Sequence, residues 1–155
     1  MEGVNVSPKM ARVSLVHACS GEEITSGFLH PLAVERINMN LFIAEEGKEG
    51  CGVLCCVAAA DGSRAGGLLK GGPDAAERAV VQEPVGLMSV FPFHSGLKTL
   101  GLALIALAEA RVPVYGFCSS LSALTFVIDH DRLDEALAAF EGCFVFPGER
   151  SLKGN

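Results

Sequence analysis

The sequence predicts an α+β protein built from two ferredoxin-like units, each with the element order β-α-β-β-α-β. Two observations predict this fold class. A shift of 75 positions aligns one part of the chain with another, and short apolar runs alternate with amphipathic stretches in that order. The chain has 155 residues, of which 50% are hydrophobic and 19% charged, so it has enough apolar side chains for a sizeable core.

The internal repeat is clearest where residues 32–42 align with residues 107–117. Leu, Ala, Arg and Phe recur in register between these stretches, and the same shift aligns Val13–Val16 with Met88–Phe91. The same offset thus aligns separate segments of the chain, which indicates a duplicated unit. Chance similarity between short apolar stretches is the alternative.

The second half of the chain has the clearer pattern. Val85–Phe91 is a short apolar run ended by Pro92, which is typical of a buried strand. Leucines at 97, 100, 104 and 107 form one face of a helix that follows Ser95-Gly96. The elements expected after it are strands at Pro113–Cys118 and Leu121–Asp129 joined by a turn at Ser119-Ser120, a helix from Leu133 to Phe140, and a fourth strand at Cys143–Phe146.

The first half follows the same order less regularly. A helix is expected to begin near His30-Pro31, because proline is tolerated in a first turn, and a loop at Ser20–Leu29 is expected before it. A second helix at Ser63–Lys70 is only weakly predicted, because glycines lie inside and directly after it. Gly62–Asp74 is therefore interpreted as a mobile connector. The expected strands are Ala11–Ala18, Asn40–Glu45, Gly52–Ala60 and Val80–Gln82. These elements divide the chain into a first unit at 9–83, a second at 84–147 and a C-terminal tail at 148–155.

Residues 102–140 resemble the regulatory ACT domains of aspartokinases. The matching segments are Leu107-Ala108-Glu109, Val112-Pro113-Val114, Ser119-Ser120, Phe126-Val127-Ile128-Asp129 and Leu133 to Leu137. The helix start His30-Pro31-Leu32 is also similar to the first ACT unit of the eukaryotic cytosolic arginine sensors. With the repeat, the resemblance covers nearly the whole chain.

The resemblance implies that two ACT units lie side by side and share a continuous antiparallel sheet with helices on one face. It also implies a non-catalytic regulatory or sensory module, with an effector amino acid bound at the seam between the units. The chain departs from the family after the Ser-Ser turn, where Leu121 and Ala123 replace the usual acidic residue and Asn. The family's lysine or threonine specificity is therefore not carried over.

Ligand chemistry can be predicted without the family. In both halves a first strand leads into a glycine-containing turn ahead of a helix, where free amides favour an anion such as an α-carboxylate. Gly96 would allow close approach of the backbone, and Ser95 could donate a hydroxyl hydrogen bond. The alternative is that Ser95 is only a helix cap and Gly96 only a turn residue. The candidate ligand-binding residues are His94, Ser95, Gly96, Leu97, Ser119, Ser120, Cys19, Ser20, Gly21, Asn38 and Asn40.

Charge and composition exclude other partners. The net charge is −6 and the 12 Lys and Arg are scattered, so neither nucleic acid nor a membrane surface is an expected partner. The longest strongly apolar stretch, Thr99–Ala108, is about half the length that spans a bilayer. No export signal is recognised, so a cytoplasmic protein is expected, with its 6 cysteines reduced. No cofactor is expected, and no metal site, because no C-x-x-C pair exists.

Two other function classes stay open beside the small-molecule effector. An enzyme finds little support, because no P-loop, G-x-S-x-G or G-x-G-x-x-G motif occurs. A protein-interaction module without a ligand is the other. With or without a ligand, a homodimer is expected through strand or helix faces, because the edge strands of such sheets pair readily.

Overall fold

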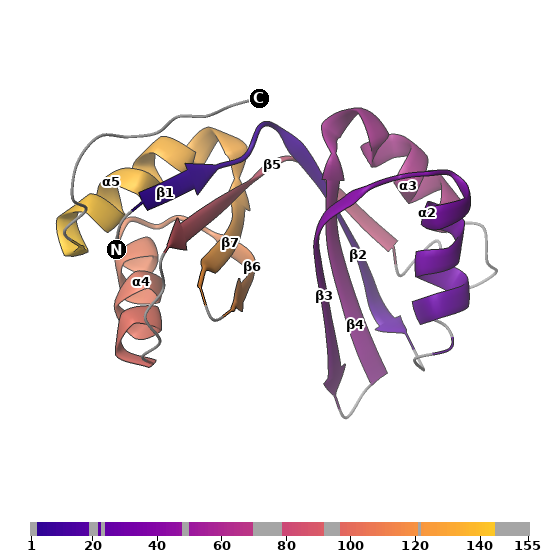
Figure 1. Cartoon of the computed structure of the whole chain (residues 1–155), viewed down its shortest axis with the longest axis horizontal. Coiled ribbons are helices and arrows are strands. Elements are labelled where there is room, and N and C mark those ends of the chain that lie inside the picture. The colour runs from indigo at the N-terminus through magenta and orange to yellow at the C-terminus, as the bar shows by residue number, and fades with distance from the viewer. Residues whose placement is uncertain are drawn as a thin grey trace. The chain divides into compact units, whose positions relative to one another are not determined.

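The chain divides into two compact units. The computed structural model describes residues 3–18, 22, 24–47, 50–69, 79–91, 97–120 and 122–144. The continuous unit is Lys9–Pro84, and the split unit combines Met1–Pro8 with Val85–Asn155. Strand β5 (Ala79–Phe91) begins in the continuous unit and ends in the split unit (Figure 1).

The continuous unit has the strand order of a ferredoxin-like fold. Its strands lie in the order β3-β4-β2-β5, with β4 between the other two complete strands. Both helical segments lie on one face of this sheet (Figure 1). The bounds are β2 (Met10–Ala18), the π-helix η1 (Ile24–Leu29), α2 (His30–Val34), β3 (Met39–Gly47), β4 (Gly50–Ala58), the 3-10 helix η2 (Ala59–Asp61) and α3 (Gly62–Leu69).

Alternate residues of β2 and β4 form the core of this unit. Ala11 and Val13 face the same side as Cys55 and Val57, because successive side chains of a strand point to opposite faces. The helical segments cover them with buried side chains that include Phe28, Leu32, Ala65 and Leu69.

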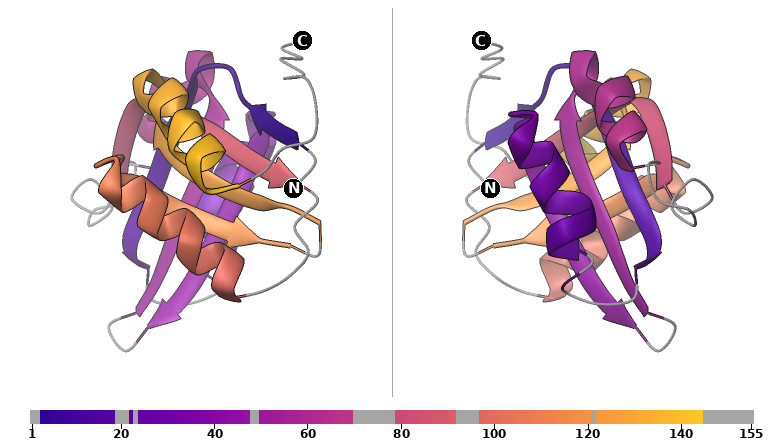
Figure 2. Two further views of the ribbon diagram at one scale, coloured as in Figure 1. Left: turned by 90° about the vertical axis from the view of Figure 1, so that its left-hand side faces the viewer. Right: turned by 90° about the vertical axis from the view of Figure 1, so that its right-hand side faces the viewer.

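The split unit has the same architecture, but its chain is interrupted. The strand order is β1-β5-β7-β6, and β1 supplies the strand next to β5 through the pair Val4↔Val90. Helices α4 and α5 lie side by side over one face of these strands (Figure 2). The bounds are β1 (Gly3–Val6), α4 (Leu97–Glu109), β6 (Val114–Ser119), β7 (Leu124–Asp129), the 3-10 helix η3 (His130–Arg132) and α5 (Leu133–Cys143).

Met88 and Val90 from β5 pack with Phe126 and Ile128 from β7 in the core of the split unit. Phe126 also packs edge-on against Phe140 of α5, with ring centroids 5.6 Å apart. Edge-to-face contacts between buried rings add to the stabilisation that burial provides.

The fold class predicted from the sequence is confirmed. The described strands form one antiparallel sheet of seven strands, in the order β3-β4-β2-β5-β7-β6 with β1 paired to β5. The duplication extends to local irregularities. The pairing of β3 with β4 shifts register between Met39 and Leu41, and that of β6 with β7 shifts between Val114 and Gly116, 75 positions later.

Three sequence predictions about local structure were wrong. The stretch Ser20–Leu29, predicted as a loop, contains η1. Residues 62–69 of the predicted mobile connector form α3, because its glycines allow close packing; a Cβ on Gly66 would lie 2.4 Å from Cγ2 of Val81. Cys143, predicted to start a strand, ends α5, and β1 occupies the place beside β5 instead. The predicted C-terminal tail lies outside the described residues.

Candidate functional site

The segment predicted to bind a ligand connects β5, which ends at Phe91, to α4, which begins at Leu97. His94, Ser95 and Gly96 lie outside the described residues. The described part of this region is therefore the end of β5 and the first turn of α4. No acidic residue lies in that first turn, so no side-chain carboxylate competes there with a bound anion for the positive end of the helix dipole.

Strand register shows which other predicted residue lies at this end of the split unit. Val90 pairs with Leu124, and Leu124 pairs with Ser119. Because neighbouring strands lie about 4.8 Å apart, Ser119 is about 10 Å from Val90. The structure thus brings the exposed Ser119 to the same end of the sheet at which the segment ahead of α4 begins.

Ser120 has a structural role in the turn between β6 and β7. Its Oγ accepts hydrogen bonds from the backbone N–H groups of Ala123 (3.0 Å) and Ser122 (3.3 Å). Its own N–H donates to the carbonyl oxygen of Ala123 at 2.8 Å. A serine hydroxyl used in this way closes the turn. Of the two predicted serines, Ser119 is therefore the one whose side chain these bonds leave out.

Of the candidate residues in the continuous unit, the structure describes Asn38 and Asn40. Cys19, Ser20 and Gly21 lie outside the described residues and follow Ala18, at the end of β2. Asn38 and Asn40 are exposed beside Met39, which pairs with Val57, and Val57 pairs with Ala11 near the start of β2. Because Ala11 and Ala18 are seven positions apart, about 23 Å along the strand separates the described asparagines from Ala18, the last described residue of β2.

A polar pair that the sequence did not reveal as a pair lies on β6 and β7. Tyr115 donates its hydroxyl hydrogen bond to the carboxylate of Asp129, with Oη 3.0 Å from both Oδ1 and Oδ2. Tyr115 lies at the register shift of β6, as Asn40 does at that of β3. The 75-residue offset between Asn40 and Tyr115 was the only signal in the sequence that their surroundings would correspond.

The buried thiols offer no nucleophile. Burial raises the pKa of Cys55 and of Cys56 to about 12, with a smaller contribution from the neighbouring thiol for Cys55. Both thiols are therefore protonated near neutral pH. Among the residues that the structure describes, no cluster of His, Cys, Asp and Glu could hold a metal ion, and no helix is long and apolar enough to cross a membrane.

Each unit has two helical segments over one face of its strands, in the strand order of a ferredoxin-like fold. No family model and no curated protein matches the sequence. Solved structures do match it. The regulatory subunit of aspartate kinase from Thermus flavus has a TM-score of 0.80 at 18% identity, over 92% of this chain and 97% of that one.

Two further structures extend the likeness. The regulatory subunit from Thermus thermophilus matches with a TM-score of 0.76 at 17% identity, over 92% of this chain and 98% of that one. Aspartokinase III from E. coli, in complex with lysine and aspartate, matches with a TM-score of 0.64 at 13% identity, and the match covers 92% of this chain and 33% of that one. The chain has the fold of the regulatory domains of aspartate kinases, as the sequence predicted.

Proposed function

We propose that the chain is a non-catalytic regulatory module that binds an amino-acid effector at the segment ahead of α4. The observation that carries this proposal is the extent of the likeness: it includes 97% of the Thermus flavus regulatory subunit and 92% of this chain. The likeness therefore extends over both units of this chain. Fold alone does not define function, so the proposal also depends on the chemistry of the split unit.

That chemistry suits the carboxylate of an amino acid. The 13-residue helix α4 would direct the positive end of its dipole toward an α-carboxylate, and the amides ahead of Leu97 would donate to it. Ser119 adds a hydroxyl at the same end of the sheet. The E. coli aspartokinase III structure, described as a complex with lysine and aspartate, supports an amino acid as the ligand class.

The setting that goes with this function is a cytoplasmic homodimer. Cys55, Cys56, Cys118 and Cys143 are free thiols, which suits a reducing compartment. Strands β3 and β6 each have one neighbour in the described sheet, so each could pair with another chain.

Thermal melts in the presence of each of the twenty amino acids test the proposal. A ligand present at 100 times its dissociation constant stabilises the folded protein by about 2.7 kcal/mol, which raises the Tm by several degrees for a chain of this size. Calorimetric titration then confirms binding. Silence across the whole panel would reject an amino-acid effector and favour an interaction module.

Matched glycine variants locate the site. Gly96→Val should abolish the ligand-induced shift, because a branched side chain would block close approach of the ligand to the backbone. Gly67→Val is the control, since nothing lies within 4 Å of a Cβ at Gly67 in the other unit. If the Gly96 variant kept the full shift, the effector would bind elsewhere.

A further inference from the structure

Helix α4 has an exposed stripe that the core of its own unit does not use. Leu102 is 40% exposed and Ile105 is 55% exposed, although both are large and apolar. Lys98 precedes them and Glu109 follows them, and both charged residues are exposed. At 100° per residue these four positions fall within about 60° of one another, on one side of the helix. They are called the α4 stripe below.

The fold does not require this stripe. The opposite side of α4 carries the buried Ala103 and Leu107, which pack in the core of the split unit. In the duplicated unit, the positions equivalent to Ile105 and Glu109 are His30 and Val34, 75 residues earlier. The helix of the continuous unit thus forms without the pattern of the α4 stripe, in which two large apolar residues lie between opposite charges. Exposed apolar patches between polar residues are typical of interaction sites.

The α4 stripe is complementary to itself. Lys98 and Glu109 are placed symmetrically about the point between Ala103 and Leu104, and so are Leu102 and Ile105. A two-fold axis through that point would place Lys98 of one chain opposite Glu109 of a second copy. The same axis would place Leu102 against Ile105 of that copy. An isologous contact needs this property, because the same patch must fit itself.

We propose that the α4 stripe is a contact surface between two copies of this chain, with the two α4 helices packed antiparallel. This inference rests on the homodimer in the proposed function and is independent of the effector. A parallel pairing would oppose Lys98 to Lys98 and Glu109 to Glu109, which like-charge repulsion disfavours.

The contact should be weak and reversible. A stable interface buries about 800 Å² on each partner, which is more than one face of a three-turn helix offers. Exposed carboxylates at Asp134 and Glu141 on the neighbouring α5 limit its extension, because a two-fold contact would bring those of both copies near each other. The dimer should therefore dissociate on dilution and weaken in high salt.

Sedimentation velocity over a wide range of protein concentration tests the surface. Ile105→Glu should raise the dimer dissociation constant at least about tenfold, because it buries a carboxylate among apolar groups. Val34→Glu is the matched control, since Val34 is 63% exposed on the duplicated helix and lies outside the stripe. That control should dimerise as the unaltered chain does.

Charge reversal tests the antiparallel arrangement. Lys98→Glu and Glu109→Lys should each weaken the dimer about five- to tenfold at low salt, since each change opposes like charges twice in a two-fold contact. The double variant should return to within about twofold of the unaltered chain, because both ion pairs re-form with their signs exchanged. Within one chain the two side chains are about 16 Å apart along the helix, so they cannot compensate each other internally.

The outcomes separate the surface from the homodimer itself. An unaltered chain that is monomeric at every concentration overturns the homodimer and this surface with it. A dimer that withstands Ile105→Glu, or one that Val34→Glu also breaks, overturns the surface and leaves the homodimer standing. Failure of the double charge reversal to restore a dimer broken by either single change overturns the antiparallel arrangement. Circular dichroism and Tm confirm that each variant is folded, and Ile105→Ala, which adds no charge, should weaken the dimer less than Ile105→Glu.

Discussion

Arg64 and Arg132 reach the same backbone position in the two units. Nη2 of Arg64 donates to the carbonyl oxygen of Glu35 at 2.7 Å, and Nη2 of Arg132 donates to that of Ala110 at 3.3 Å. Glu35 and Ala110 are 75 residues apart and each follows the last turn of its helix, α2 or α4. Each guanidinium thus satisfies a carbonyl that the helix leaves unpaired, at the negative end of the helix dipole.

The two arginines do not align with each other in the repeat. In each unit the arginine forms an ion pair with an acidic residue three positions away, but the order of acid and arginine along the chain is opposite in the two units. Asp61 pairs with Arg64 in the continuous unit, and Arg132 pairs with Glu135 in the split unit, in both cases across three residues. Asp61 aligns with Arg132 and Arg64 with Glu135 at one common offset of 71. The charges have exchanged places while the cation still reaches the same carbonyl.

A charge swap at this position should therefore be tolerated. Arg64→Ala should lower the free energy of unfolding by about 1 kcal/mol, because the Glu35 carbonyl loses its donor. Arg64→Glu alone should also lower the free energy of unfolding. Adding Asp61→Arg should recover at least half of that loss, because in the split unit an arginine at the equivalent position, Arg132, donates to the equivalent carbonyl oxygen. Urea denaturation measures each value. Recovery by Asp61→Ala in place of Asp61→Arg would show that the guanidinium plays no such part.

The decrease in the free energy of unfolding at acid pH should depend in part on Glu135. Its hydrogen bond with Arg132 lowers the pKa of this carboxyl below its ordinary value. A lowered pKa in the folded state means that the pair stabilises the protein above the ordinary glutamate range and loses this effect as pH falls through the lowered value. Glu135→Gln should thus be less stable than the unaltered chain at neutral pH, and the two should converge in acid. Asp134→Asn is the neighbouring control, and a constant difference at all pH values would contradict this account.

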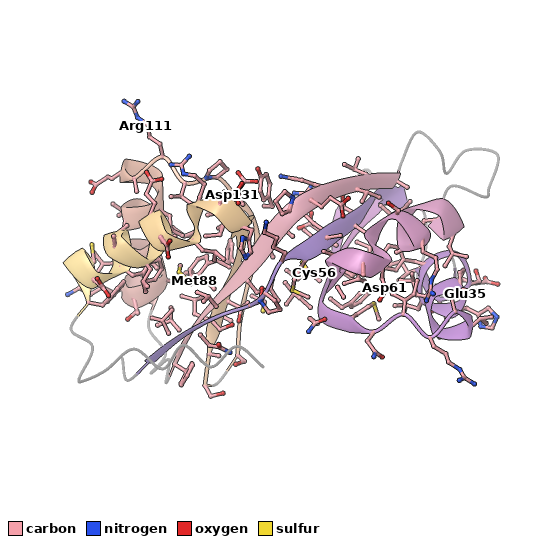
Figure 3. The ribbon with its side chains drawn as sticks, turned by 90° about the horizontal axis from the view of Figure 1, so that it is seen from above. Glu35, Cys56, Asp61, Met88, Arg111 and Asp131 are labelled. Atoms are coloured by element: carbon pink, nitrogen blue, oxygen red, sulfur yellow. The ribbon has the colours of Figure 1, made fainter. Side chains whose placement is uncertain are left out.

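The helix ends of the two units predict a stabilising substitution. Arg36 has φ 56° and Arg111 has φ 55°, and these are left-handed conformations that glycine usually adopts. Both N–H groups donate to a carbonyl three residues back, and those of Ile37 and Val112, one residue later, donate five residues back, each at 2.9 Å. The Arg111 side chain points away from the ribbon (Figure 3), so the backbone geometry is the main constraint there.

Arg111→Gly should therefore raise the free energy of unfolding by about 0.5 to 1 kcal/mol, because relief of the left-handed strain exceeds the extra freedom of the unfolded chain. Chemical denaturation measures the difference. Arg111→Ala is the control and should give no gain, because alanine is strained there as arginine is. Equal stabilisation by alanine would indicate that charge, and not backbone conformation, was responsible.

Large and small residues have exchanged places between the strand and the helix. A Cβ on Gly62 would lie 2.5 Å from that of Ala11, and a Cβ on Gly86 would lie 2.7 Å from Cδ1 of Leu133. Ala11 aligns with Gly86 and Gly62 with Leu133 under the two offsets of the repeat. Each unit thus has a glycine at this contact, on the helix in one case and on the strand in the other.

Gly86→Ala should cost about 1 to 3 kcal/mol by overpacking, and Leu133→Ala about 2 to 5 kcal/mol by leaving a cavity. The double variant should be less destabilised than the sum by at least about 1 kcal/mol, because the added methyl then fills vacated space. Gly142→Ala serves as the control, since nothing lies within 4 Å of a Cβ there, and it should cause no loss of stability and at most a small gain from helix propensity. Strict additivity at Gly86 and Leu133 would refute the packing argument.

The internal repeat was enough to predict most strands and helices, whereas features that depend on partners distant in sequence were missed. The repeat offset identified the strands at Val13 and Met88, because both units bury the same apolar positions. It did not find β1, because residues 3–6 pair with Met88–Phe91, and partners so distant in sequence leave no local pattern. Of the candidate site, only the place of Ser119 beside the end of β5 follows from register. Local chemistry did not separate it from Ser120, whose hydroxyl is used in its own turn.

The free energy of unfolding at alkaline pH should depend on the ionisation of the buried thiols. Burial raises the pKa of Cys55 and of Cys56 from 9.0 to about 12, so the folded state disfavours their thiolates. A pKa raised by folding gives stability that is complete below the unfolded value and is lost as pH rises toward the folded value. The free energy of unfolding should thus fall between about pH 9 and 12, by up to about 1.4 kcal/mol per pH unit for each thiol.

A variant with Cys55→Ala and Cys56→Ala should start less stable and show a shallower fall over that range, because two titrating groups are gone. All other side chains are common to both proteins, so the difference between the two slopes isolates the thiols. Cys143→Ala is the control, because Cys143 is exposed and its removal should leave the slope unchanged. In the folded protein near neutral pH, an alkylating reagent should modify Cys143 well before Cys55 or Cys56, as peptide mass mapping would show. Early modification of the buried pair would mean that β4 opens far more readily than its burial implies.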